Sequence, residues 1–579
     1  MRKKKFALYI SIILVLVVAA FIVMRSYLFS NAKTNTQSKQ AAASPIDLRP
    51  AIIAKLQSLV KSGSDGLYDL SIKEIEPDIT SSTVDVIGAK LIPNMQSLKM
   101  LDSLKKAPDD IFTVSLDSLH ITGINVDDLL HTSDIQLDSI VISKPVITCD
   151  HQPKEYNRLQ RENEQKKTLY QKLMGQLKSV NIHSIIIQQC TYTDRQKNKL
   201  DKIFNDVTMQ FSNLLIDSAS QFDKERVFFS KKVNISCNNF ISRTADSLYL
   251  FKIGSVQINA TDHYLVANQV AFIPRGTKQE FEKKIKYQDN RFDMRFPKIV
   301  AKNIDWWALA NNESFVCDEM QLYNAVIKDY IDRRLPTSDS TNHIEDFPHQ
   351  LIMEIPIKIN IKKLRLYNFN VLYEEFNPSA NKSGTVTFNN MSGSVSNISN
   401  IPAIMKTYQH TTANIKGLFM NAASFSSNFS LDLRKYKTGN FSMQMSMAAI
   451  NKDQINPIAE PLGLFTIKTG TITKADTKIE GDNYTSNVTL EMLYNDLHLS
   501  SLKKENGTDT TMRKKPLIDF VANTFLIKNE NPAHNDDPRI TQVKVTRNPS
   551  QAFFGFIWKG MLTGILETVG LPKKYAGKR

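Results

Sequence analysis

Residues 112–149 read FTVSLDSLHITGINVDDLLHTSDIQLDSIVISKPVITC, and this stretch decides the fold class. Short runs in which apolar and polar residues alternate are separated by turn residues, a pattern typical of β-strands. A second copy runs from 296 to 331, where FPKIVAKNIDWWALA matches LDSLHITGINVDDLL and MQLYNAVIKDYI matches IQLDSIVISKPVI. We interpret the two copies as a degenerate internal repeat of β-meander type.

The same alternation continues toward the C-terminus, where one side of each strand is apolar and the other polar. Such strands predict a sheet with one face in water and the other against apolar material. That material is either a second sheet, as in a sandwich, or the inside of a sheet curled into a groove, and periodicity does not separate the two. The candidate lining residues are Ile355, Ile357, Ile359, Ile361, Phe441, Met443, Met445 and Met447.

The N-terminal segment 6–24 reads FALYISIILVLVVAAFIVM, without charge or proline. At about 1.5 Å per residue, a helix of this length covers roughly the hydrocarbon core of a bilayer, so we predict a single transmembrane helix. Basic residues at 2–5 place the N-terminus in the cytoplasm and the bulk outside. The alternative is a cleaved signal peptide, whose apolar core is shorter and precedes a small-x-small site. The predicted anchor residues are Phe6, Leu8, Ile10, Ile13, Leu16, Phe21 and Met24.

Charge and motifs argue against nucleic-acid binding and catalysis. The formal net charge is +15, but the basic residues are spread along the chain without a dense stripe. The sequence contains no HExxH, CxxC, GxSxG, P-loop or GxGxxG motif, so we predict no enzyme, no metal and no cofactor. His343 and His349 bracket a polar loop that we interpret as solvated, although a metal site there is an alternative. The widely spaced cysteines are expected in cores, with a Cys149–Cys190 disulfide as an alternative.

A helix is predicted near the C-terminus, at 550–569, between Pro549 and Gly570. Its apolar residues fall on one face, and the polar side carries Lys559 and Glu567. Two interpretations remain open: a membrane-interfacial helix, and a lid packed over the open end of the sheet. The face consists of Phe554, Trp558, Met561, Leu562, Ile565 and Val569.

Three features together resemble AsmA-like envelope proteins, a TamB-related family of the bridge-like lipid-transfer type. They are the repeat unit with its INVDDLL turn, the block KLRLYNFNVLYEEFNPSANKSGTVTFNNMSGSVSNISN, and the block NPIAEPLGLFTIKTGTITKADTKIEGDNYTSNVTLEMLYNDLHLSSLKK. The resemblance implies an elongated, twisted antiparallel sheet curled into an apolar groove, anchored in a bacterial inner membrane with its bulk in the periplasm. It implies binding or conduction of phospholipid acyl chains toward the outer membrane. The family also allows an envelope scaffold or an assembly factor for outer-membrane proteins.

These expectations define a domain plan. It consists of a cytoplasmic stub (1–5), the transmembrane helix (6–24), a flexible tether (25–49), the β-groove region (50–505), and a C-terminal region (506–579) with the amphipathic helix (550–569). The tether is small and polar, without apolar periodicity. The partners expected from this plan are phospholipid, the inner membrane and other envelope proteins.

Overall fold

The computed structural model describes most of the chain from Arg49 onward. The described residues are 49–571 except 79, 125–133, 158–178, 197–198, 339–340, 505–511, 517–526 and 535. The predicted transmembrane helix therefore lies outside the described residues, as do its anchor positions. Within the described ranges, no helix has both the length and the apolar character needed to cross a membrane.

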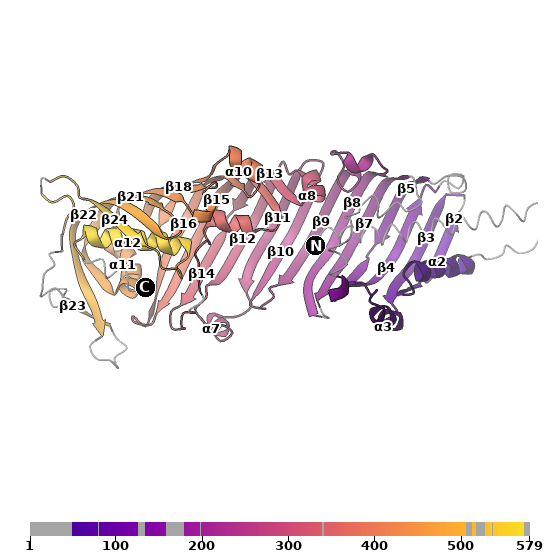
Figure 1. The fold of residues 1–579 in the computed structure, drawn as a ribbon, viewed down its shortest axis with the longest axis horizontal. Helices are drawn as coiled ribbons and strands as arrows, with labels where there is room; N and C mark the ends of the chain where they lie inside the picture. The colour runs from indigo at the N-terminus through magenta and orange to yellow at the C-terminus, as the bar shows by residue number, and fades with distance from the viewer. Residues whose placement is uncertain are drawn as a thin grey trace, which may run out of the picture. The chain divides into compact units, whose positions relative to one another are not determined.

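Contacts group the chain into two compact units. Unit 1 comprises the described part of Met1–Arg243 with Lys252–Ala267 and Ala310–Asn312, and unit 2 comprises Thr244–Phe251, Asn268–Leu309 and the described part of Glu313–Arg579. The fold is mainly β, as predicted (Figure 1). The chain passes between the units within β10 (Tyr249–Asn259) and β11 (Tyr264–Pro274), and again around the end of α8 (Trp306–Asn312).

Unit 1 is a sheet flanked by short helices. Its elements are α2 (Arg49–Gly63), β1 (Tyr68–Ser71), β2 (Glu74–Asp78), β3 (Thr83–Pro93), α3 (Met95–Ser103), β4 (Asp110–Thr122), β5 (Asp134–Ser143), β6 (Val146–His151), β7 (Ser179–Gln196), β8 (Lys199–Ile216), the 3-10 turn η1 (Ser220–Phe222) and β9 (Ser230–Arg243). Their side chains alternate between buried and exposed, as expected for strands with one covered face.

Unit 2 begins with α7 (Lys278–Glu282), β12 (Arg291–Lys302), α8 (Trp306–Asn312), β13 (Ser314–Tyr323), β14 (Val326–Asp332), α9 (Pro348–Glu354), β15 (Lys358–Asn377), β16 (Lys382–Ser399) and α10 (Pro402–Thr407). It continues with β17 (His410–Phe419), β18 (Ala423–Asp432), η2 (Tyr436–Thr438), β19 (Phe441–Met447), β20 (Ile450–Asn451), α11 (Lys452–Ile458) and η3 (Ala459–Gly463). Its last elements are β21 (Phe465–Gly481), β22 (Thr485–Lys504), β23 (Met512–Pro516), β24 (Ile540–Thr546) and α12 (Phe553–Thr568).

Both copies of the predicted repeat have the same strand pairing. In the first copy, β4 pairs antiparallel with β5 and with β6, which both pair parallel with β7. In the second copy, β12 pairs in the same way with β13 and β14, which both pair parallel with β15. Equivalent partners are Val146 with Thr191 and Val326 with Asn370.

The parallel pairs correct the prediction of an antiparallel meander, because the sheet of each unit is mixed. Parallel neighbours require a crossover connection of about a dozen or more residues. The chain between the end of β6 at His151 and the start of β7 at Ser179 is long enough for it, as is the chain between Asp332 and Lys358, which includes α9. The sequence pattern predicted the strands, but it did not predict which neighbouring strands run parallel and which run antiparallel.

A shared irregularity keeps the apolar side chains of unit 1 on one side of the sheet. In β5 the buried residues are Ile135 and Leu137, and then Ile140 and Ile142, so the alternation shifts by one residue near Asp138. The paired strand β7 shows the same shift. Such bulge-like steps turn the following residues back toward the covered face.

Candidate functional site

A continuous apolar row crosses the sheet of unit 2. Phe429 lies opposite Met443, Met443 opposite Ile479, Ile479 opposite Val488, and Val488 opposite Val543. The row thus joins β18, β19, β21, β22 and β24. Because directly paired residues of antiparallel strands share a face, these side chains form one apolar surface, which we call the Phe–Met face.

Helix α12 packs on the Phe–Met face. Its side chains Phe553, Phe556 and Ile557 join the same buried cluster as Phe441 and Met443. Two helix glycines permit the close approach. A Cβ on Gly560 would lie 3.0 Å from Cγ2 of Val488, and one on Gly564 would lie 3.3 Å from Cδ2 of Leu490. The helix is therefore seated directly on β22.

Phe347, in the crossover before β15, reaches the same cluster. Its ring centroid lies 4.7 Å from that of Phe553 and 5.6 Å from that of Phe441. The guanidinium of Arg547 lies 4.4 Å from the Phe347 ring centroid and donates hydrogen bonds to the carbonyls of Asn483, Gln551 and His343. Arg547 is buried, and this burial lowers the pKa of its guanidinium. Arg547 therefore connects the crossover to the start of α12.

The four predicted residues of β19 lie on the Phe–Met face. Phe441 and Met443 are buried, Met445 packs against the same cluster, and Met447 packs against the adjoining cluster around Tyr494. These two clusters contain none of the four predicted isoleucines of the β15 region.

The predicted isoleucine stripe needs correction. Ile359 and Ile361 belong to β15 and are partly buried, but Ile355 and Ile357 precede the strand and are exposed. The reason is local: α9 ends with Ile355 as its C-cap, and β15 begins only at Lys358. The alternation of isoleucine with polar residues therefore begins before the strand β15 itself begins.

The predicted apolar face of the C-terminal helix is also partly wrong. Phe554 is 67% exposed, Val569 is buried, and Trp558, Met561, Leu562 and Ile565 are partly buried. Phe556, which we assigned to the polar side, is completely buried. An apolar helix of this kind is covered on more than one side. Trp558 accordingly packs near Val386, Ile458 and Leu462, while Phe556 packs toward the sheet.

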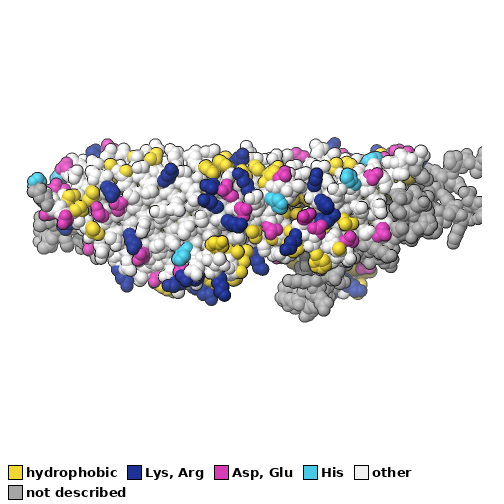
Figure 2. All heavy atoms as spheres, turned by 90° about the horizontal axis from the view of Figure 1, so that it is seen from above, with side chains coloured by type: hydrophobic (Ala, Val, Ile, Leu, Met, Phe, Trp, Pro, Cys, Tyr) yellow, Lys and Arg dark blue, Asp and Glu magenta, His cyan; other side chains and the backbone are white. Residues whose placement is uncertain are grey.

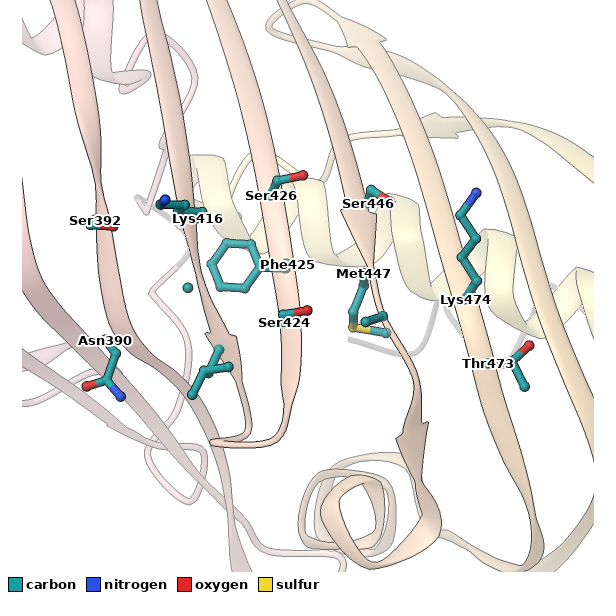
Figure 3. Close-up of a pocket in the computed structure, with 13 residues that line it drawn as sticks. Asn390, Ser392, Lys416, Ser424, Phe425, Ser426, Ser446, Met447, Thr473 and Lys474 are labelled. Carbon is teal, nitrogen blue, oxygen red and sulfur yellow. The ribbon is translucent and has the colours of Figure 1, made fainter.

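A hollow of about 720 Å³ lies among the same strands and is lined by polar and apolar side chains from both faces of the sheet (Figure 3). Ser426 lies opposite Ser446, whereas their neighbours Phe425 and Met447 pair on the face turned toward α12. The hollow is lined by Asn390, Ser392, Lys416, Gly417, Leu418, Ser424, Phe425, Ser426, Ser446, Met447, Ala448, Thr473 and Lys474. No feature of the sequence predicted it, because serine-rich strand faces are common on solvated sheets.

The described residues do not bring together a catalytic or metal-binding group. No cluster of three or more His, Cys, Asp or Glu side chains that could hold a metal occurs among them. Nδ1 of His343 lies 2.7 Å from Asp346, whereas His349 is buried and neither of its ring nitrogens has a hydrogen-bond partner. The two histidines therefore have different surroundings.

The four cysteines are buried, free thiols. Burial raises the pKa of Cys190 to about 12 and that of Cys317 to about 11, so both thiols are protonated at neutral pH. The suggested Cys149–Cys190 disulfide is absent from the structure.

Surface charge is mixed on the face shown in Figure 2, where Lys and Arg side chains stand among Asp and Glu side chains. Comparison of the chain with protein-family models and with curated proteins gives no match. The functional argument therefore rests on the sequence pattern and on the two faces of the unit 2 sheet.

Proposed function

We propose that this protein binds phospholipid through acyl chains that lie on the apolar face of its β-sheet. In this proposal it is anchored in a bacterial inner membrane, extends into the periplasm, and serves phospholipid transfer toward the outer membrane. The observation that carries the proposal is the apolar row from Phe429 through Met443 to Val543. The neighbouring row on the reverse side of the same strands is polar and includes Asn428, Gln444 and Lys478. The resemblance to AsmA-like envelope proteins supports the cellular setting.

The chemistry of the Phe–Met face suits acyl chains. Burial of each methylene group stabilises a bound chain by about 0.8 kcal/mol, so even part of one acyl chain yields substantial affinity. Met443, Met445 and Met447 follow one another on the same side of β19. Unbranched thioether side chains adapt to ligands of variable shape, which fits a mixture of saturated and kinked chains.

In this structure helix α12 covers the Phe–Met face, the surface on which acyl chains would bind. We propose that it closes this part of the sheet and that acyl chains reach Met445 when α12 moves aside. In the first turn of α12, Phe554 and Gly555 are exposed, whereas Phe553 beside them is buried in the cluster.

The test is photocrosslinking from two neighbouring positions of β19 in the full chain, expressed in a diderm bacterium. A photoreactive residue at Met445 points toward the Phe–Met face, and one at the exposed Gln444 points to the opposite face. We expect phospholipid adducts at position 445 and few at 444, identified by mass spectrometry. Equal adducts at both positions, or none at 445, would refute the proposal.

The alternative function is an envelope scaffold or assembly factor for outer-membrane proteins. Strand β24 favours it, because its described pairing is to β22 alone and an edge strand can accept a strand from a partner. In the same experiment, this alternative predicts polypeptide adducts from a photoreactive residue at Gln542 of β24, and no lipid adducts at 445.

A further inference from the structure

Helix α3 in unit 1 exposes an unusual amount of apolar surface. Met95 is 60% exposed, Met100 53% and Leu104 57%, and Ile92 just before the helix is 49% exposed. Single exposed apolar side chains are ordinary, but a concentration of large ones marks an interaction surface. We call these four residues the α3 patch.

The patch is held in place by the opposite side of the helix. Leu101 and Leu98 pack with Leu67 and Ala107, which fixes the orientation of α3. The side-chain oxygen of Asn94 caps the helix by accepting hydrogen bonds from the backbone N–H groups of residues 96 and 97. The outward half is therefore presented by an ordered element and not by a loop.

The charges around the patch are predominantly positive. Lys99 lies on the outward half between the methionines, and Lys90, Lys105 and Lys106 flank it, all exposed and without an ion-pair partner among the described residues. The one carboxylate of the helix, Asp102, accepts hydrogen bonds from Lys154 and from the Tyr156 hydroxyl at 3.0 Å and 2.7 Å. The surface thus combines apolar side chains with unpaired cations.

We infer that the α3 patch docks on an anionic bilayer surface, with its apolar side chains among the acyl-chain segments just below the headgroups and its lysines at the phosphates. Apolar side chains ringed by lysine are the chemistry that a bilayer interface binds. A second copy of the chain carries the same positive charge and is a poorer occupant.

The test uses the full chain, reconstituted in vesicles of phosphatidylethanolamine with phosphatidylglycerol. Because the native cysteines are buried, a single Met100→Cys variant can be labelled selectively with a fluorophore. Gln188→Cys, at an exposed position of β7, is the matched control. We expect brominated lipids to quench the label at position 100 at least twofold more than the label at 188.

A triple charge reversal, Lys99→Glu, Lys105→Glu and Lys106→Glu, should lower the quenching at position 100 to the control level, as should vesicles of pure phosphatidylcholine. Circular dichroism must show that the variant is folded. Quenching equal to that at position 188 overturns the inference, and so does concentration-dependent self-quenching without lipid quenching, which would show a second copy on the patch. The inference does not depend on the proposed lipid-binding face, because that face is tested separately by photocrosslinking from position 445.

Discussion

At the scale of single residues, His349 is the most unusual titratable group of unit 2. It is fully buried at the start of α9, and neither ring nitrogen has a hydrogen-bond partner in the described structure. Burial lowers the pKa of His349 to about 4, and the nearby carboxylate of Asp432 opposes this shift only in part. The folded protein therefore keeps this imidazole neutral at pH values where the unfolded chain protonates it.

The stability of unit 2 should consequently fall in mild acid. Between pH 6.5 and 4 the unfolded state binds a proton at His349 that the folded state does not bind. The contribution of His349 to the free energy of unfolding is therefore complete above pH 6.5 and decreases toward pH 4. The complete loss corresponds to roughly 3 kcal/mol. Urea unfolding at several pH values should show this slope, and His349→Leu should flatten it. His183→Gln, at an exposed position, is the control, and an unchanged slope in His349→Leu would contradict the assignment.

Arg547 permits a second prediction at this scale. Its guanidinium binds several backbone carbonyls and stacks on Phe347, a geometry that lysine does not reproduce. We expect Arg547→Lys to lower the free energy of unfolding by roughly 2 kcal/mol and to increase protease cleavage just before α12. Arg539→Lys, at the opposite end of β24, is a comparison in which the link to the crossover at His343 is intact. Cleavage that is unchanged in Arg547→Lys would show that Arg547 does not secure the helix.

At the scale of elements, the glycines of α12 decide how closely it sits on the sheet. Gly560→Leu should push the helix from β22, because even a Cβ at this position lies 3.0 Å from Val488. We expect a destabilisation of about 1–3 kcal/mol and a severalfold increase of lipid adducts from Met445. Gly555→Leu is the matched control, since nothing lies within 4 Å of a Cβ there. Adduct yields that rise equally in both variants would rule out α12 as the closing element.

Prediction from sequence succeeded where one physical cause dominated. The alternation of Phe441, Met443 and Met445 with polar residues reflects a strand with one covered face, and the structure places these side chains together. The prediction failed for α12 because assigning the apolar residues of a helix to one face assumes that a single surface covers the helix. Phe556 and Trp558 pack against different elements, so no single apolar face describes this helix.

The parallel pairings and the hollow between β16 and β21 were not predictable for a different reason. Alternation is the same in parallel and antiparallel strands, so the pattern of Val326 to Asp332 contains no information about the direction of β15. The hollow is lined by residues of several strands between β16 and β21, and no local pattern around Ser426 or Ser446 encodes how these strands meet. Both features arise from tertiary geometry.

At the scale of the whole molecule, the shared pairing of the two repeat copies suggests that stability is local. Each strand contacts mainly its neighbours, so removal of one core side chain should destabilise mainly the unit that contains it. Ile479→Ala, at a completely buried site of β21, should accelerate amide hydrogen exchange in β18 to β22 and leave β4 to β7 unchanged. Ile182→Ala in β7 should have the reverse effect, each at a local cost of about 2–5 kcal/mol. Uniform acceleration throughout the chain would show one cooperative structure instead.

The position of α12 along the chain has a consequence for biosynthesis. The helix follows every strand that it covers, so during translation β18 to β24 leave the ribosome before their cover exists. In a chain interrupted before Phe553, the apolar side chains of Phe441, Met443 and Ile479 are uncovered and can bind chaperones, membranes and other nascent chains. The time for which this surface stays open to such contacts would then depend on how soon α12 is synthesised and folds onto it.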